Sequence, residues 1–170
     1  PLLTHDMTDL TQKEKFEVNH NMSAIDHNWQ NTINNYYDQV FGLGIHLFKA
    51  LISCFSSNIE LADFAFQRPK TLSTLRFNYY PNQEKPVEIS SQDGVALGCE
   101  THVDSGIMTI LYQDKKGGLQ VQNRHNLQWY DVPHDPQSYV VNSGLALQYL
   151  TNGHFKATNH RVLFNKEERI

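Results

Sequence analysis

The sequence predicts a mainly β domain preceded by helices, with its strands arranged as a sandwich, a jelly roll or a small barrel. Three observations lead to this fold class. The chain has 170 residues, which is the usual size of one domain. Apolar residues recur at helical spacing in only one long stretch. After Arg68-Pro69, short alternating or β-branched runs follow one another, separated by turn sequences.

The helices are predicted in the N-terminal part of the chain. Residues 1–27 are polar and are expected to be partly helical or irregular, with a helical turn or two in TQKEKFEV. The long helix is predicted from Asn28 to Phe55, because its apolar residues follow the i, i+3, i+4, i+7 pattern of one helix face. A shorter helical segment is predicted in IELADFAF. The residues of the apolar face are Ile33, Tyr37, Val40, Gly44, Leu47 and Leu51.

Strands are predicted in the remainder of the chain. Turn sequences such as Lys116-Gly117-Gly118 and Thr151-Asn152-Gly153 separate them. We therefore divide the chain into a polar segment (1–27), a helical support region (28–67) and a β core (68–170). The predicted strands are 72–80, 106–113, 118–122, 127–132, 138–142, 145–150 and 160–165.

Composition excludes several classes of function. The net charge is −4, and no block of like charge is longer than a few residues, so binding to nucleic acid or to anionic lipid has no support. No apolar run reaches the roughly 20 residues of a membrane span, and PLLTHDMTDL does not resemble a signal peptide. Cys54 and Cys99 are too few for a disulfide framework or a zinc ribbon. We expect a cytoplasmic protein, and its oligomeric state stays open.

Three residues predict a metal site. In a strand, side chains two apart point to one face, so His102 and Asp104 would present an imidazole and a carboxylate together. His160 stands at the head of another predicted strand and supplies a third donor. Two histidines and one carboxylate on one face form the facial triad of non-haem Fe(II) enzymes, which leaves the opposite positions of the metal open. An isolated His-x-Asp pair would more often be an ordinary surface pair.

Longer stretches of the sequence favour a metal site over an ordinary surface pair. From about Leu72 to Ile170 the sequence resembles the 2-oxoglutarate- and Fe(II)-dependent oxygenases of the isopenicillin N synthase-like group. The resemblance implies a distorted double-stranded β-helix, or jelly roll, preceded by helices, and it implies that His102, Asp104 and His160 are the catalytic metal ligands. The matching stretches are LRFNYYP, THVDSGIMTILYQDKKGGLQVQ, Trp129–Pro133, VVNSG, LQYLTNG and ATNHRVLFN-KEERI.

The same resemblance implies a site for the co-substrate 2-oxoglutarate. Alternation in LSTLRFNYYP places Arg76, Asn78 and Tyr80 on one strand face. The family pattern assigns Asn78 and Tyr80 to 2-oxoglutarate, and Arg169, nine residues after His160, to its far carboxylate. Arg76 is a candidate for an anionic group of the primary substrate, such as an amino acid or another carboxylate. A structural ion pair with a nearby acidic residue is the alternative for Arg76.

The implied activity couples oxidative decarboxylation of 2-oxoglutarate by Fe(II) and O₂, giving succinate and CO₂, to hydroxylation or a related oxidation of a small molecule. Two alternatives stay open. One is an oxidase of the isopenicillin N synthase or aminocyclopropane-carboxylate oxidase kind, which does not consume 2-oxoglutarate. The other is a non-catalytic jelly-roll binding module. Compared with this family, the chain is expected to be incomplete at both ends and to lack the last strand of the core.

Overall fold

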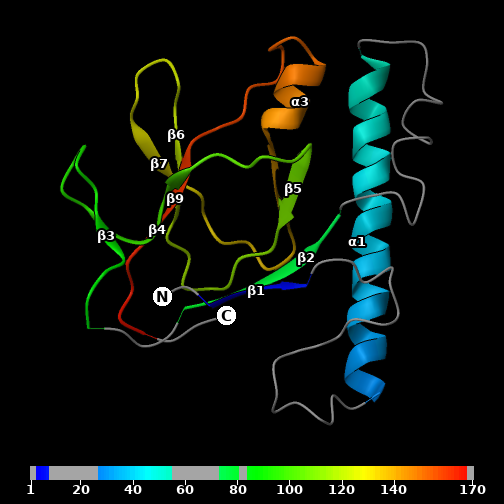
Figure 1. Cartoon of the computed structure of the whole chain (residues 1–170), viewed down its shortest axis with the longest axis horizontal. Helices are drawn as coiled ribbons and strands as arrows, with labels where there is room; N and C mark the ends of the chain where they lie inside the picture. Colours follow the sequence, from blue (N-terminus) through cyan, green and yellow to red (C-terminus); the bar gives the residue numbers. More distant parts are fainter. Residues whose placement is uncertain (1–2, 8–26, 55–72, 81–83, 168–170) are drawn as a thin grey trace. The chain divides into compact units, whose positions relative to one another are not determined.

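The computed structural model describes residues 3–7, 27–54, 73–80 and 84–167 (Figure 1). The chain divides into two compact units. One unit is Pro1–Thr4 with Asn78–Ile170, and the other is His5–Phe77. The described elements are β1 (Leu3–Met7), α1 (His27–Ser53), β2 (Leu75–Tyr79), β3 (Glu88–Ile89), β4 (Ala96–His102), β5 (Met108–Leu111), β6 (Leu119–Gln122), β7 (Trp129–Asp131), β8 (Val140–Ser143), α3 (Leu145–Leu150) and β9 (His160–Leu163). The predicted class, mainly β with an N-terminal helix, is confirmed.

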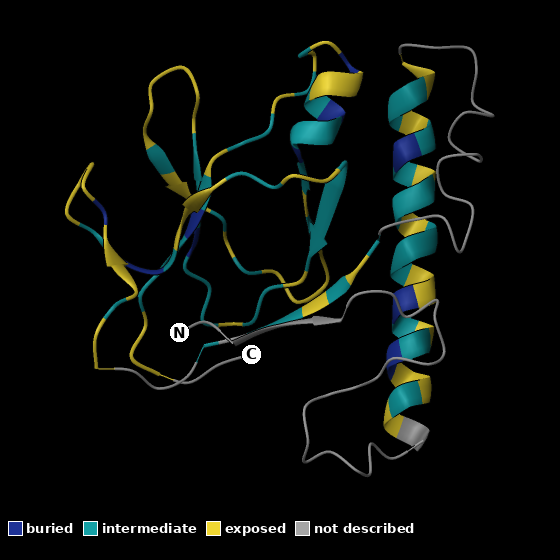
Figure 2. Ribbon diagram, viewed as in Figure 1, coloured by how far each residue is buried: buried dark blue, intermediate teal, exposed yellow. Residues whose placement is uncertain are grey.

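The long helix α1 agrees with the predicted one to within two residues at each end. Ile33 and Tyr37 of the predicted face are buried, together with Phe48. Figure 2 shows these few buried positions separated by intermediate and exposed ones along the helix. The Tyr37 hydroxyl donates to the carbonyl of Ser73 at 3.1 Å. No helix in the described ranges is long and apolar enough to cross a membrane. The helical predictions in 11–18 and 59–66 lie outside the described residues.

The larger unit contains a five-stranded antiparallel sheet in the order β3-β4-β9-β6-β7, and a separate antiparallel pair, β5-β8. Leu97 of β4 and Leu119 of β6 are buried core residues. They flank β9 on its two sides, because Leu97 pairs with Leu163 and Leu119 with Val162. β9 is therefore a central strand, and side chains on β4 and β9 are held at defined cross-strand positions.

Residues 145–150 were predicted to be a strand, and this prediction is wrong, since Leu145–Leu150 forms the short helix α3. A short apolar run does not distinguish strand from helix by its pattern. Leu and Ala are strong helix formers, and the Thr151 hydroxyl donates to the carbonyl of Leu147, one turn back, at 2.8 Å. Leu147 itself is buried. The sequence also did not predict β1 or β3, and of β4 it indicated only the end at His102.

Arg161 is an almost fully buried charge on β9, with 2% of its surface exposed. Its guanidinium makes two hydrogen bonds to the carboxylate of Asp93, at 2.7 and 3.1 Å, and one from Nε to Gln120 at 2.8 Å. The guanidinium carbon lies 4.0 Å from the centre of the Trp129 ring. This set of contacts, the Arg161 cluster, attaches the turn after β3 to β6, β7 and β9.

The Arg161 cluster predicts an acid-dependent loss of stability. Hydrogen bonds from Arg161 above all, and from Ser90, hold the pKa of Asp93 well below its ordinary value of 3.8. A carboxyl whose pKa is lower in the folded chain stabilises the fold fully above the unfolded value, and this contribution is lost as the pH falls through the folded value. We expect the difference in unfolding free energy between wild type and Asp93→Asn to be constant above about pH 5 and to shrink below about pH 4. Urea denaturation of both proteins across this range measures it, and a difference that does not change with pH would contradict the assignment.

Candidate metal centre

His102 and His160 lie directly opposite each other on neighbouring strands. They are a register pair at the end of the β4-β9 ladder, which has irregularities between Leu97 and His102. Directly opposed residues of an antiparallel pair project to the same face. The two imidazole rings accordingly lie 4.3 Å apart between centroids, tilted by 57°. The fold thus brings together two donors that are 58 residues apart in the chain, from position 102 to position 160.

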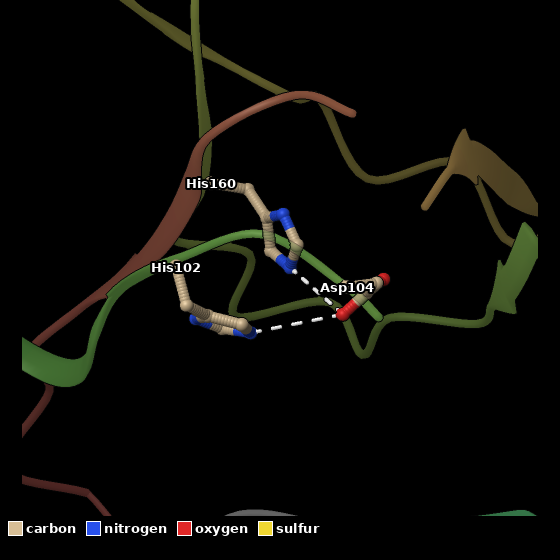
Figure 3. A group of neighbouring side chains, drawn as sticks. All are labelled: His102, Asp104 and His160. Atoms are coloured by element: carbon tan, nitrogen blue, oxygen red, sulfur yellow. Dashed lines mark ion pairs between the residues drawn. The ribbon is translucent and has the colours of Figure 1, made fainter. Parts of the chain in front are cut away.

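Both imidazoles are held in the same tautomer. His102 donates from Nδ1 to the carbonyl of Glu100 at 2.8 Å, and His160 donates from Nδ1 to the carbonyl of Thr158 at 3.0 Å. A carbonyl oxygen can only accept, so in each neutral ring the hydrogen is on Nδ1 and the lone pair is on Nε2. Both Nε2 atoms face one oxygen of Asp104 (Figure 3). A backbone carbonyl that fixes the outer nitrogen is the usual support of a metal-binding histidine.

Asp104 reaches this position from a turn. The sequence predicted that His102 and Asp104 share a strand face, and this is wrong in its geometry, because β4 ends at His102 and Asp104 follows in the loop. Asp104 Oδ1 nevertheless lies 3.9 Å from Nε2 of His102 and 3.6 Å from Nε2 of His160. The pairing therefore depends on how the turn after β4 is held, which no strand pattern can indicate.

The turn that carries Asp104 is held from two sides. The other carboxylate oxygen, Oδ2, accepts hydrogen bonds from the Thr109 hydroxyl at 2.5 Å and from the Asn142 amide at 2.8 Å. The backbone carbonyl of Asp104 accepts from the amide of Leu145 at 2.8 Å. Two more carbonyls of the turn accept from the amide of Ala146 in the first turn of α3, so α3 and the β5-β8 pair together position the carboxylate.

Two of the three residues have shifted pKa values. Burial raises the pKa of Asp104, but hydrogen bonds from Thr109 and Asn142 and the two histidines outweigh it, so the pKa lies below its ordinary value. The Cys99 sulfur, 4.0 Å from Nδ1, raises the pKa of His102 to about 9, together with the Glu100 carbonyl and the Asp104 charge and against the effect of burial. The lowered pKa keeps Asp104 ionised, as a metal ligand must be, whereas the raised pKa of His102 means that a proton competes with a metal ion for this imidazole.

The donor set fits Fe(II). His102, Asp104 and His160 each offer one ligand atom, and these atoms lie within 4.8 Å of one another. His160 and Asp104 are mostly buried, with side chains 15% and 23% exposed, whereas His102 is 43% exposed. Two neutral imidazoles and one carboxylate on one side of a site match the ligand preference of non-haem iron and leave the other side open.

A glycine allows the turn with Asp104 to approach α3 closely. A Cβ at Gly144 would lie 2.9 Å from the carbonyl oxygen of Asp104 and closer still to that of Gly106. We expect Gly144→Ala to lower the free energy of unfolding by about 2 kcal/mol, because the backbone must shift to admit a methyl group. Urea denaturation measures this loss. Gly106→Ala in the same turn is the matched control, since its Cβ meets nothing within 4 Å; equal losses in the two variants would contradict the steric explanation.

The other predicted site residues are described only in part. Asn78, the last residue but one of β2, is half-buried, and so is Tyr80 just after the strand. Arg76 is exposed on β2 and belongs to the smaller unit. Arg169 lies outside the described residues. The roles of Asn78, Tyr80, Arg76 and Arg169 stay predictions.

Sequence reasoning did not find Thr109, Asn142 or the Arg161 cluster. Thr109 and Asn142 both lie in predicted strands, but only the pairing of those strands places their side chains on Asp104. Arg161 follows His160 directly, so alternation places it on the opposite face of β9 from the metal ligands. Alternation was therefore the one sequence signal for Arg161. Its partner Asp93 lies 68 residues earlier in the chain, and no sequence pattern connects the two.

Comparison with known proteins agrees with this site. Residues 71–170 match the family model of the 2OG-Fe(II) oxygenase superfamily. The chain is 33% identical over 136 residues to isopenicillin N synthase of Streptomyces griseus, which covers 79% of this chain and 41% of that protein. It is 43% identical over 89 residues to deacetoxyvindoline 4-hydroxylase of Catharanthus roseus, covering 52% of this chain and 20% of that protein.

A solved structure shows the same fold. A full-length protein of Neurospora crassa, crystallised in complex with alpha-KG, superposes with a TM-score of 0.76 and 25% identity, covering 98% of this chain and 49% of that chain. The chain belongs to the 2OG-Fe(II) oxygenase superfamily, and its β core is the double-stranded β-helix of these enzymes. The resemblance inferred from the motifs is confirmed. The chain spans about two fifths of the isopenicillin N synthase and half of the Neurospora crassa protein.

Proposed function

We propose that the protein is a 2-oxoglutarate- and Fe(II)-dependent dioxygenase that acts on a small molecule. The observation that carries the proposal is the convergence of His102 Nε2, His160 Nε2 and Asp104 Oδ1 on one point, with both imidazoles held in the metal-binding tautomer. Bound Fe(II) would supply the oxidative chemistry, in which 2-oxoglutarate and O₂ give succinate and CO₂ and the substrate is hydroxylated or otherwise oxidised.

The chain's own residues hold and orient the reactants. His102, Asp104 and His160 would occupy one side of the metal and leave the opposite side to the keto acid and O₂. For the keto acid we propose Asn78, Tyr80 and Arg169, because a guanidinium can grip a carboxylate with two parallel hydrogen bonds. The Neurospora crassa protein was crystallised in complex with alpha-KG, which supports the proposal that this chain also binds a keto acid. A cytoplasmic location stays a prediction from composition.

For the primary substrate we propose a small molecule with an anionic group, such as an amino acid or another carboxylate, that pairs with Arg76. Support comes from the position of Arg76, exposed on β2 and two residues before Asn78. Loss of turnover in Arg76→Ala with unchanged keto-acid binding is the expected result. Parallel losses of activity and thermal stability would instead show a structural ion pair.

One titration tests the function. Under anaerobic conditions, addition of Fe(II) and 2-oxoglutarate to the protein is expected to produce a visible metal-to-ligand charge-transfer band, and admission of air is expected to release succinate. Asp104→Ala is the control and should show neither. Iron binding without the band would defeat the proposal, and absence of iron binding would leave only a binding module.

An oxidase that does not consume 2-oxoglutarate is the second candidate. The 33% identity to isopenicillin N synthase over 79% of this chain favours it specifically. The same experiment separates the two, because an oxidase of this kind would bind Fe(II) and consume O₂ with its substrate but would release no succinate. A screen of amino acids and small carboxylates with O₂ uptake as the readout would identify that substrate.

A further inference from the structure

The carboxylate of Asp104 has two oxygens with separate environments. Oδ1 faces the Nε2 atoms of His102 and His160. Oδ2 is turned away from both rings (Figure 3) and accepts two hydrogen bonds, from Thr109 at 2.5 Å and from Asn142 at 2.8 Å. An ionised carboxylate can only accept, so the Asn142 amide presents its nitrogen to Asp104.

The two donors are themselves a matched pair. Thr109 on β5 and Asn142 on β8 are directly opposed in the antiparallel register. Directly opposed residues project to one face about 5 Å apart, which is why both side chains can reach a single oxygen atom. Neither residue lies on the strands of the two histidines, since β5-β8 is a separate pair from the five-stranded sheet.

From these contacts we propose that Thr109 and Asn142 are positioning residues that make Asp104 a one-oxygen ligand of the metal. The inference rests on the proposed metal site. It adds a reason why one side of the metal stays open. A free carboxylate can chelate a metal through both oxygens and so occupy two positions. With Oδ2 held by two donors, Asp104 would take a single position on the metal and would leave the open side free for the keto acid and O₂.

Metal binding by the chain without any substrate tests the inference. The probe is Co(II), whose affinity is measured by calorimetry and whose visible spectrum reports coordination number. Thr109→Val removes the hydroxyl at nearly constant volume, and Asn142→Leu removes the amide. We expect each variant to bind Co(II) about 10-fold more weakly and the double variant about 100-fold more weakly, with an altered spectrum. Thr109→Ser, which keeps the hydroxyl, should restore both affinity and spectrum.

Asn126→Leu is the matched control for Asn142→Leu. Asn126 is exposed in the turn between β6 and β7, where its amide donates to the Tyr130 hydroxyl at 3.1 Å, so its loss should leave the Co(II) affinity and spectrum unchanged. Thr109→Val and Asn142→Leu proteins that bind Co(II) with the wild-type affinity and spectrum would overturn the inference and leave the metal site intact. Failure of the wild type to bind Co(II) or Fe(II) would instead overturn the proposed function, and with it the inference.

Discussion

Replacing His160 by alanine is expected to weaken Fe(II) or Co(II) binding by more than about 100-fold, since even the loss of an outer hydrogen bond to a ligand costs 10- to 100-fold. His160 is the most buried of the three ligands, with 15% of its side chain exposed. Its Nε2 lies closer to Asp104 Oδ1 than the Nε2 of His102 does. Removal of the ring leaves one imidazole and one carboxylate, which is too few donors for a stable site in water.

The measurement is calorimetric titration with Co(II), accompanied by circular dichroism to show that the variant folds. His125→Ala is the matched control, because His125 lies exposed in the turn between β6 and β7 of the same unit. It should bind as the wild type does. Wild-type affinity in a folded His160→Ala protein would exclude His160 as a ligand.

Replacing Arg161 by alanine is expected to lower the free energy of unfolding by about 3 kcal/mol. The largest part of this loss is packing, because Arg161 is 2% exposed and its guanidinium lies on the Trp129 ring. The ion pair contributes less, since the Asp93 side chain is 32% exposed and water partly screens its charge. The side-chain oxygen of Gln120 would also lose the hydrogen bond that it accepts from Arg161 Nε.

Urea denaturation of the Arg161→Ala protein measures this loss. Arg161→Lys should lose about half as much, because a lysine keeps the charge and the stem but not the planar fork that bonds two partners at once. Arg124→Ala provides the control, since Arg124 is exposed in a turn and its loss should change stability by less than about 0.5 kcal/mol. An Arg161→Ala protein as stable as this control would show that the cluster does not hold the turn after β3.

Periodicity alone was sufficient for the regular elements. The helix over His27–Ser53 and the strands around Ile110, Val121 and Val162 all lie where apolar spacing predicted them. It was insufficient for LALQYL, whose six residues fit both patterns. The burial of Leu147 and the local hydrogen bond from Thr151 to its carbonyl favour a helix there. Irregular strands such as β4, whose ladder with β9 shifts register, also have no simple pattern.

Residue types were enough to identify the donor set, because His102, Asp104 and His160 stand within family motifs. How that set is arranged depends on contacts that form only in the folded chain. The register of β4 against β9 opposes the two histidines, and the hydrogen bonds from Thr109 and Asn142 orient Asp104 after its strand has ended. The physical reason is that ligand identity is a local property of residue types, whereas the direction of a ligand atom depends on contacts between segments distant in the chain.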